Sequence, residues 1–216
     1  GNSGAGKTSL ILALIRNGAR YIANERLLVK QGTDGFHVLG YPMAIAVGIG
    51  TAMQFEYLAP LIESPDELLY PRSRFSKSRV SRTAPAERHT LADKLQFLPE
   101  ELERYITGGH AILGGQITKV VVPKVSKSDS GAQAQELSAS ALLAVLRDNY
   151  MGLKNDRSHP VWIQNKAPRL DPEVEDASIQ SLSTLPAVAF QYGLSGPADT
   201  TNYLSTILDL AELEGT

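Results

Sequence analysis

The sequence opens with Gly1-Asn2-Ser3-Gly4-Ala5-Gly6-Lys7-Thr8, the stretch that decides which fold we expect. It meets every fixed position of the pattern G-x-x-x-x-G-K-[ST], which is typical of a phosphate-binding loop (P-loop). Glycines let such a loop turn sharply, so that successive backbone N–H groups point inward and surround phosphate oxygens. The stretch therefore predicts a nucleoside triphosphate as the ligand, together with Mg²⁺.

An apolar helix is expected directly after this loop, over 9–17, with Gly18 ending it. The positive end of its dipole would face the phosphates. Lys7 is expected to reach the β- and γ-phosphates, and the Thr8 hydroxyl to hold Mg²⁺. The residues predicted to bind the nucleotide are Asn2, Ser3, Gly4, Ala5, Gly6, Lys7, Thr8 and Ser9. A P-loop also follows a β-strand, so we expect this chain to be a fragment that lacks its N-terminal strand.

Composition narrows the class of protein. The chain has 216 residues, a net charge of −2 and no cysteine. This length suits one α/β domain over 1–216, and the absence of cysteine removes disulfides, zinc-thiolate sites and thiol nucleophiles. No apolar run reaches the roughly 18 residues that span a bilayer. The near-neutral charge predicts neither a nucleic-acid nor a membrane partner, and we expect a cytoplasmic protein.

Local patterns predict a mixed sheet flanked by helices. A β-hairpin is expected over 27–39, around the turn signal Gln31-Gly32-Thr33-Asp34-Gly35. Short strands are predicted over 20–23, 44–47, 117–122 (closed by Pro123) and 187–192. Helices are predicted over 51–58, 99–106, 136–150 and 199–213, and 155–176 is expected to be irregular.

Residues 60–98 differ in character from the rest. Between Arg72 and Arg88 there are six basic residues and one acidic residue, with interspersed Ser, Thr and Pro. This composition predicts a mobile basic insertion. Such charge runs are usually solvated surface, which is the interpretation that we favour. The alternative is a lid over the phosphates, or an attraction for an acidic acceptor, with Arg72 and Arg74 as candidate residues.

A P-loop enzyme also needs a carboxylate near the metal or the attacking group. Only one apolar strand ends in an acid at a suitable place, Tyr21-Ile22-Ala23-Asn24-Glu25, one helix after the loop. Parallel packing of this strand would bring Glu25 near Thr8. The sequence contains no D-x-x-G, and Asn165-Lys166-Ala167-Pro168 lacks the Asp of a guanine-reading motif. A Ras-like GTPase is therefore disfavoured, and ATP is expected rather than GTP.

The loop, the apolar helix, Gly18 and the strand ending in Asn24-Glu25 resemble the HPr kinase/phosphorylase family and its relatives, which include kinases of peptide natural products. The match covers 1–29 well, extends loosely to 40–42 and 187–213, and leaves 60–180 unmatched. The resemblance implies an HPr kinase-like P-loop fold and an ATP- and Mg²⁺-dependent kinase, with a hydroxyl of a peptide, protein or small molecule as acceptor. Because the family forms oligomers, it also implies a homo-oligomer.

The resemblance implies catalytic roles for Lys7 and Glu25 and metal binding by Thr8 and Glu25. The family typically has two acids at the strand end, but here Asn24 takes the place of one, and an amide cannot act as a base. Asn24 and Arg26 are further candidates for a second site. The family's functional histidine precedes the P-loop and has no counterpart in these residues. Two alternatives stay open: a regulatory ATPase that switches a partner interaction, and a nucleotide-binding domain with a structural role only.

Overall fold

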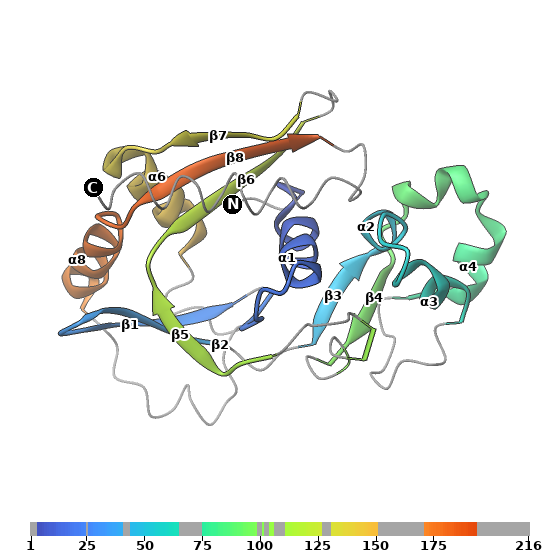
Figure 1. Ribbon diagram of the computed structural model, residues 1–216, viewed down its shortest axis with the longest axis horizontal. Coiled ribbons are helices and arrows are strands. Elements are labelled where there is room, and N and C mark those ends of the chain that lie inside the picture. Colours follow the sequence, from blue (N-terminus) through green and yellow to red (C-terminus); the bar gives the residue numbers. More distant parts are fainter. Residues whose placement is uncertain are drawn as a thin grey trace.

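The computed structural model describes residues 4–24, 26–40, 44–64, 75–98, 101, 104–105, 111–126, 131–150 and 171–193. In this part of the chain, strands and helices combine into a mixed α/β structure (Figure 1). The α/β class predicted from the sequence is therefore confirmed. In place of the one mixed sheet expected, the strands of the described residues pair into three small sheets.

The first sheet has the order β1-β2-β5 and contains the predicted hairpin. Its strands pair antiparallel, and Gly32 lies opposite Gly35 across a two-residue turn. Gly35 has a φ of +126°, a conformation that favours glycine. The bounds of these strands are β1 Leu27–Gly32, β2 Gly35–Gly40 and β5 Gly114–Ile117.

The second and third sheets lie on either side of helix α1, which spans Lys7–Arg16 (Figure 1). One is the antiparallel pair β3 Ile45–Gly48 and β4 Lys94–Phe97. The other has the order β6-β8-β7, with β8 parallel to β6 and antiparallel to β7. Its strands are β6 Val120–Ser126, β7 Gln133–Glu136 and β8 Ala187–Gly193.

Helix α1 is apolar on two sides and joins two hydrophobic clusters. Leu12 and Ile15 are buried in a core with residues of β3 and β4 and of the helices beside them. Leu10 instead packs against Phe190 and Tyr192 of β8. Because a helix with two buried stripes must lie between two layers, the apolar sequence of α1 explains its central position. The helix predicted over 9–17 is confirmed, and it begins two residues earlier.

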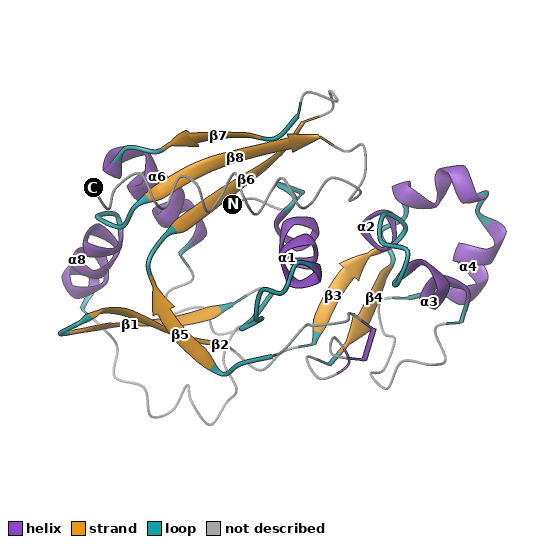
Figure 2. Cartoon of the chain, viewed as in Figure 1, coloured by secondary structure: helices purple, strands orange, loops and turns teal. Residues whose placement is uncertain are grey.

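The remaining helices gather at the two ends of the molecule (Figure 2). Helices α6 and α8 contact each other at one end, where Arg147 pairs with Asp176. The bounds of the helices are α2 Ile49–Ala52, α3 Ala59–Glu63, α4 Lys77–Arg82, the 3₁₀ helix η2 Pro85–Thr90, α6 Ala139–Asn149 and α8 Pro172–Leu182. In the part of the chain that the structure describes, no helix is both long and apolar enough to cross a bilayer.

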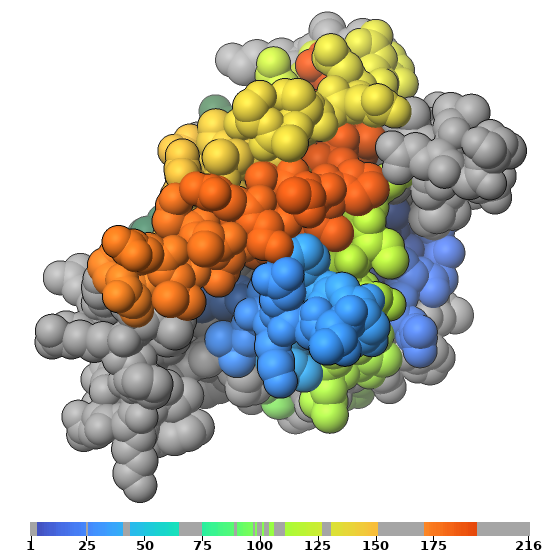
Figure 3. All heavy atoms as spheres, turned by 90° about the vertical axis from the view of Figure 1, so that its left-hand side faces the viewer, coloured from blue at the N-terminus to red at the C-terminus, as the bar shows by residue number. Residues whose placement is uncertain are grey.

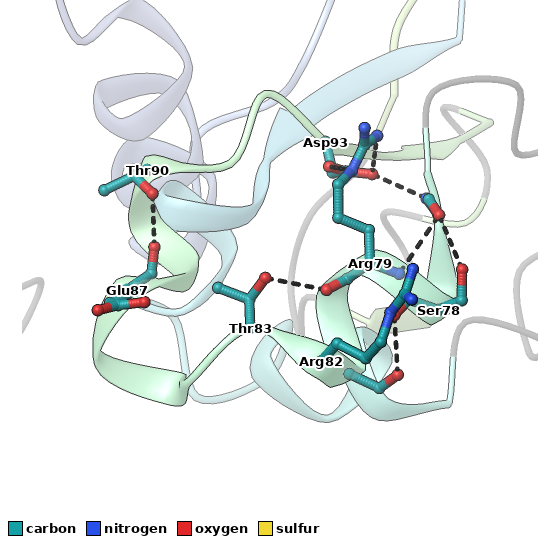
Figure 4. A network of polar contacts seen from close by, with 9 residues as sticks. Ser78, Arg79, Arg82, Thr83, Glu87, Thr90 and Asp93 are labelled. Atoms are coloured by element: carbon teal, nitrogen blue, oxygen red, sulfur yellow. Dashed lines mark hydrogen bonds and ion pairs between the residues drawn. The ribbon is translucent and has the colours of Figure 1, made fainter.

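The prediction of a basic loop over 60–98 is wrong for 60–63, which belong to α3, and for 77–97, where α4, η2 and β4 form. Ser76 caps α4 by accepting a hydrogen bond from the Arg79 N–H. The buried Asp93 carboxylate holds this region together, because it accepts hydrogen bonds from the Ser76 N–H at 2.8 Å and from Arg79 Nε at 2.8 Å and Nη2 at 2.9 Å (Figure 4). The sequence predicted that this basic segment is a solvated loop, but Arg79 pairs with Asp93, 14 positions further along the chain.

We expect Arg79→Ala to lower the urea midpoint of unfolding, because it leaves the Asp93 carboxylate buried without its cation. The loss stays below that of a fully buried pair since the Arg79 side chain is 58% exposed. Urea unfolding at pH 7 measures it. The matched control is Arg82→Ala on the same helix, whose guanidinium contacts only the Ser78 carbonyl in Figure 4, with an expected change within about 0.5 kcal/mol.

The same pair predicts an acid dependence. The hydrogen bond from Arg79 holds the pKa of the Asp93 carboxyl below its usual range, although burial opposes this. A depressed folded-state pKa adds stability that is present above the ordinary carboxyl pKa of about 4 and is lost as the pH falls through the lower value. The stability difference between wild type and Arg79→Ala should therefore shrink below about pH 4. A difference that stays constant there would contradict this role of the pair.

Several other boundaries differ from those predicted. The strand predicted over 117–122 is divided, because Ile117 ends β5 and β6 starts at Val120. Strand β6 does not close at Pro123 but continues to Ser126, because within the described residues β6 is a sheet edge, where a missing N–H is tolerated. The helix predicted over 136–150 begins only after the Ser138 cap, since Glu136 belongs to β7. The helix predicted over 51–58 is wrong: α2 ends at Ala52, and α3 starts at Ala59. In the predicted irregular segment 155–176, Asp171 and Pro172 start α8.

The strand predicted over 20–23 is reduced to a single parallel bridge between Tyr21 and Ala111. The strands predicted over 44–47 and 187–192 are confirmed as β3 and β8. The helix predicted over 199–213 lies outside the described residues, as does most of the helix predicted over 99–106.

The β1–β2 hairpin lies open on one face of the molecule, next to α8 (Figure 3). Leu28 and Leu39 face each other across the two strands, and 48% and 57% of their surfaces are exposed. Strand β1 is also the edge of its sheet, and edges of this kind promote association with other strands. The exposed Lys30 in the middle of β1 places a charge there, which opposes such pairing.

Candidate functional site

The candidate site is the turn that leads into α1. Gly4 and Gly6 have φ values of +82° and +92°, so two glycines of the P-loop pattern adopt the left-handed conformation. A residue with a Cβ adopts this conformation only at a cost of about 1–2 kcal/mol. Alternating left-handed and right-handed residues turn backbone N–H groups toward one side, which is the basis of anion-binding nests. The local geometry thus agrees with the role expected of these glycines.

The N-terminus of α1 is the end of the helix that would face an anion. Gly6 is its N-cap residue, and among the described residues no side chain caps this end. The first N–H groups of a helix lack partners within the helix and carry the positive end of its dipole. An exposed Gly4 and half-buried Lys7 and Thr8 lie around this end. These groups therefore lie at the end of α1 where the sequence pattern predicts phosphate oxygens.

Thr8 meets the polar pair that follows α1. Its Oγ1 lies 3.4 Å from Oδ1 of Asn24, a long hydrogen bond that the Thr8 hydroxyl donates. The prediction that the segment after α1 returns to the P-loop is supported at Asn24. Glu25 lies outside the described residues, as do Asn2, Ser3, Arg72 and Arg74. Arg26 is half-buried directly after Glu25.

The Thr8 and Asn24 oxygens suit a magnesium ion. Mg²⁺ prefers oxygen ligands at about 2.1 Å in octahedral geometry, so neighbouring ligands lie about 3.0 Å apart. The 3.4 Å between these two oxygens is close to that separation. Both ligands are neutral, so the phosphates or a carboxylate would have to supply the negative charge. Glu25, next to Asn24 in the chain, is the carboxylate that the sequence offers.

Ser9 contacts a different element. Its hydroxyl lies 3.4 Å from the Thr51 hydroxyl of α2. Ser9, the first residue of the helix expected over 9–17, was predicted to bind the nucleotide together with the loop residues. The structure places its side chain against α2, which leaves its backbone N–H in the first turn of α1 as the group available for that role.

Tyr192 is a site residue that the sequence did not indicate. Its hydroxyl donates a 2.6 Å hydrogen bond to the Gly6 carbonyl, from a position 186 residues further along the chain. A Cβ added to Gly6 would lie 2.2 Å from this hydroxyl and 2.3 Å from Cγ2 of Val125. Gly6 is therefore required both by its φ and by the close approach of β6 and β8. An aromatic residue at the end of a strand carries no signal of such a contact.

The described arginines of the basic segment contact protein groups. Arg79 pairs with Asp93, Arg82 donates to the Ser78 carbonyl, and Arg88 contacts Glu63 and the Thr83 carbonyl. Each of these contacts lies within the α3, α4, η2 and β4 region. They agree better with a structural role of the segment than with a lid over the phosphates.

Comparison with known proteins places the chain in no family: it matches no family model, no curated protein and no solved structure. The kinase resemblance therefore rests on the sequence pattern of the loop, the apolar helix, Gly18 and the Asn24-Glu25 pair, with the looser matches at 40–42 and 187–213.

Proposed function

We propose that the chain is an ATP- and Mg²⁺-dependent kinase with an HPr kinase-like P-loop fold. It transfers the γ-phosphate to a hydroxyl of a peptide, protein or small-molecule acceptor. The observation that carries this proposal is the contact of Thr8 with Asn24 at the start of α1. It supports the proposal because it joins the predicted phosphate-binding end of the helix to the polar pair that the kinase resemblance requires beside it.

Each residue has a role that its chemistry allows. Lys7 and the backbone N–H groups of the loop bind and neutralise the triphosphate. Thr8, with Asn24 or Glu25, holds the magnesium ion, which neutralises charge on the phosphate oxygens. Phosphoryl transfer depends mainly on positioning and charge stabilisation, so this small set of groups is sufficient for the reaction.

Glu25 is the base in this proposal and accepts the proton of the acceptor hydroxyl. We expect Glu25→Gln to lower the transfer rate at least about 100-fold, because the amide cannot take up a proton. Nucleotide affinity should change only a few-fold, since Lys7 and the loop are intact. Intact-mass spectrometry of candidate acceptors, incubated with ATP and Mg²⁺, measures transfer as a gain of about 80 Da.

The matched control is Glu136→Gln, which makes the same change at an exposed position of β7. It should leave transfer unchanged. Near-normal transfer by Glu25→Gln would show that Glu25 is not the base. Loss of transfer together with loss of nucleotide binding would assign Glu25 to metal binding instead.

One observation favours a second function, that of a regulatory ATPase. Asn24, and not an acid, lies beside Thr8, and its amide can neither accept a proton nor supply charge to a metal ion. Release of inorganic phosphate from ATP, with no mass gain on any acceptor, would support this ATPase and contradict the kinase.

A further inference from the structure

Tyr192 connects the last described strand to the first turn of α1. It lies at the end of β8 that passes the N-terminal end of α1 (Figure 1), and only 5% of its surface is exposed. Its ring stacks on Phe190, with 5.8 Å between the centroids, and Val125 pairs with it in the neighbouring strand. The side chain is therefore held in place by packing, so its hydroxyl occupies a defined position.

The Gly6 carbonyl receives two hydrogen bonds. The Leu10 N–H donates one at 2.9 Å, as the first bond of the helix, and the Tyr192 hydroxyl donates the other at 2.6 Å. A carbonyl oxygen has two lone pairs, so both are used. Leu10 also packs on Phe190 and Tyr192, which joins the same turn of the helix to β8 through apolar contact.

This carbonyl belongs to the same peptide unit as the Lys7 N–H. A peptide unit is planar and trans, so its C=O and N–H point in opposite directions. Holding the Gly6 carbonyl against Tyr192 therefore turns the Lys7 N–H away from β8. Restraint matters here because Gly6 has no Cβ, and glycine rotates between φ regions more readily than any other residue. The hydrogen bond from the Leu10 N–H lies in the first turn of α1, where helices fray. Without Tyr192, this bond would be the only restraint given above on the Gly6 carbonyl.

The geometry points to Tyr192 as a positioning residue for phosphate binding: its hydroxyl fixes the Gly6–Lys7 peptide so that the Lys7 N–H donates to a phosphate group of the nucleotide. This inference rests on the proposed function, because it assigns the anion bound at α1 to a polyphosphate. Tyr192 acts through the backbone of the P-loop and needs no contact with the nucleotide.

The test is Tyr192→Phe, which removes the hydroxyl and keeps the ring. We expect the Kd for Mg²⁺·ATP to rise about fivefold, the size of effect typical of one lost hydrogen bond. The hydrogen bond from Tyr192 to the Gly6 carbonyl affects only the binding of the phosphate groups. The Kd for inorganic tripolyphosphate should therefore rise by a similar factor. Titration calorimetry of the full chain measures both. The matched control is Tyr57→Phe, since the Tyr57 hydroxyl makes no hydrogen bond within the described residues.

Two further readouts separate positioning from general damage. The melting temperature of Tyr192→Phe should fall by less than about 4 °C. Without nucleotide, the carbon-13 shift of the Gly6 carbonyl and the exchange rate of the Lys7 amide should change in Tyr192→Phe and not in Tyr57→Phe. A merely structural loss would raise amide exchange throughout α1, and not selectively at Lys7.

The outcomes distinguish the inference from the function on which it rests. If wild type binds Mg²⁺·ATP and Tyr192→Phe binds it equally well, the inference is wrong and the proposed function stands. The inference is also wrong if Tyr192→Phe loses affinity for ATP but not for tripolyphosphate, because the inferred role of Tyr192 concerns phosphate binding. If wild type binds neither ligand, the proposed function fails, and the inference fails with it.

Discussion

Lys7→Ala should abolish phosphoryl transfer and ATP hydrolysis while leaving the fold intact. Lys7 lies in the first turn of α1, at the end where the helix dipole is positive and, among the described residues, no side chain caps the backbone. In a P-loop this lysine reaches the β- and γ-phosphates, where charge develops in the transition state. Removing one such group typically costs about 10²–10³-fold in rate, so kcat/KM should fall at least about 100-fold.

Phosphate release and acceptor mass measure this effect, with Lys30→Ala as the matched control. Lys30 is exposed on the edge strand β1 and should show wild-type rates after the same substitution. The melting temperatures of both variants should remain within a few degrees of wild type. A Lys7→Ala protein that turns over ATP at a normal rate would exclude a P-loop mechanism, whatever binds at this end of α1.

The elements that could be predicted from the sequence are those whose signal is local. The apolar run after the loop predicted α1, and the turn signal at 31–35 predicted the hairpin of β1 and β2. Strand β8 was equally clear, because its short run of apolar and aromatic residues is typical of a strand. In each of these elements, the pattern of its own residues is enough to predict the helix or strand that they form.

The elements that were missed depend on partners far away in the sequence. Strand β7, Gln133–Glu136, is polar and exists because it pairs with β8. Helix α4 has a basic, serine-rich sequence, and Asp93 in the strand region beyond it provides the charge that orders it. The local pattern of each segment contains only one member of these pairs. Local patterns therefore predicted a loop where α4 forms and did not predict the strand β7.

The candidate site divides in the same way. The proximity of Thr8 to the end of the following segment was expected from a helix that returns the chain to the loop, and the contact with Asn24 agrees with it. Tyr192 could not be expected, because 186 residues separate it from Gly6. The sequence thus predicted the contact that the loop makes with the segment directly after α1. It did not predict the contact with Tyr192 of β8.

Gly6→Ala should destabilise the protein by about 2–5 kcal/mol and abolish nucleotide binding. Two costs add at this residue. The φ of +92° places an alanine in the left-handed region, at about 1–2 kcal/mol. Its Cβ would also lie 2.2 Å from the Tyr192 hydroxyl and 2.3 Å from Val125, and such overpacking costs about 1–3 kcal/mol. If Tyr192 moves to relieve the clash, its bond to the Gly6 carbonyl is lost.

The backbone cost and the steric cost are separated by comparing the urea unfolding of Gly6→Ala with that of Gly4→Ala. Gly4 has a similar φ of +82°, but no described atom lies within 4 Å of its added Cβ, so only the backbone cost of about 1–2 kcal/mol should appear. The double variant Gly6→Ala/Tyr192→Phe tests the clash directly. Phe removes the nearest atom, so the double variant should be less destabilised than the sum of the two single variants. Strict additivity would mean that the tyrosine hydroxyl does not limit the space at Gly6.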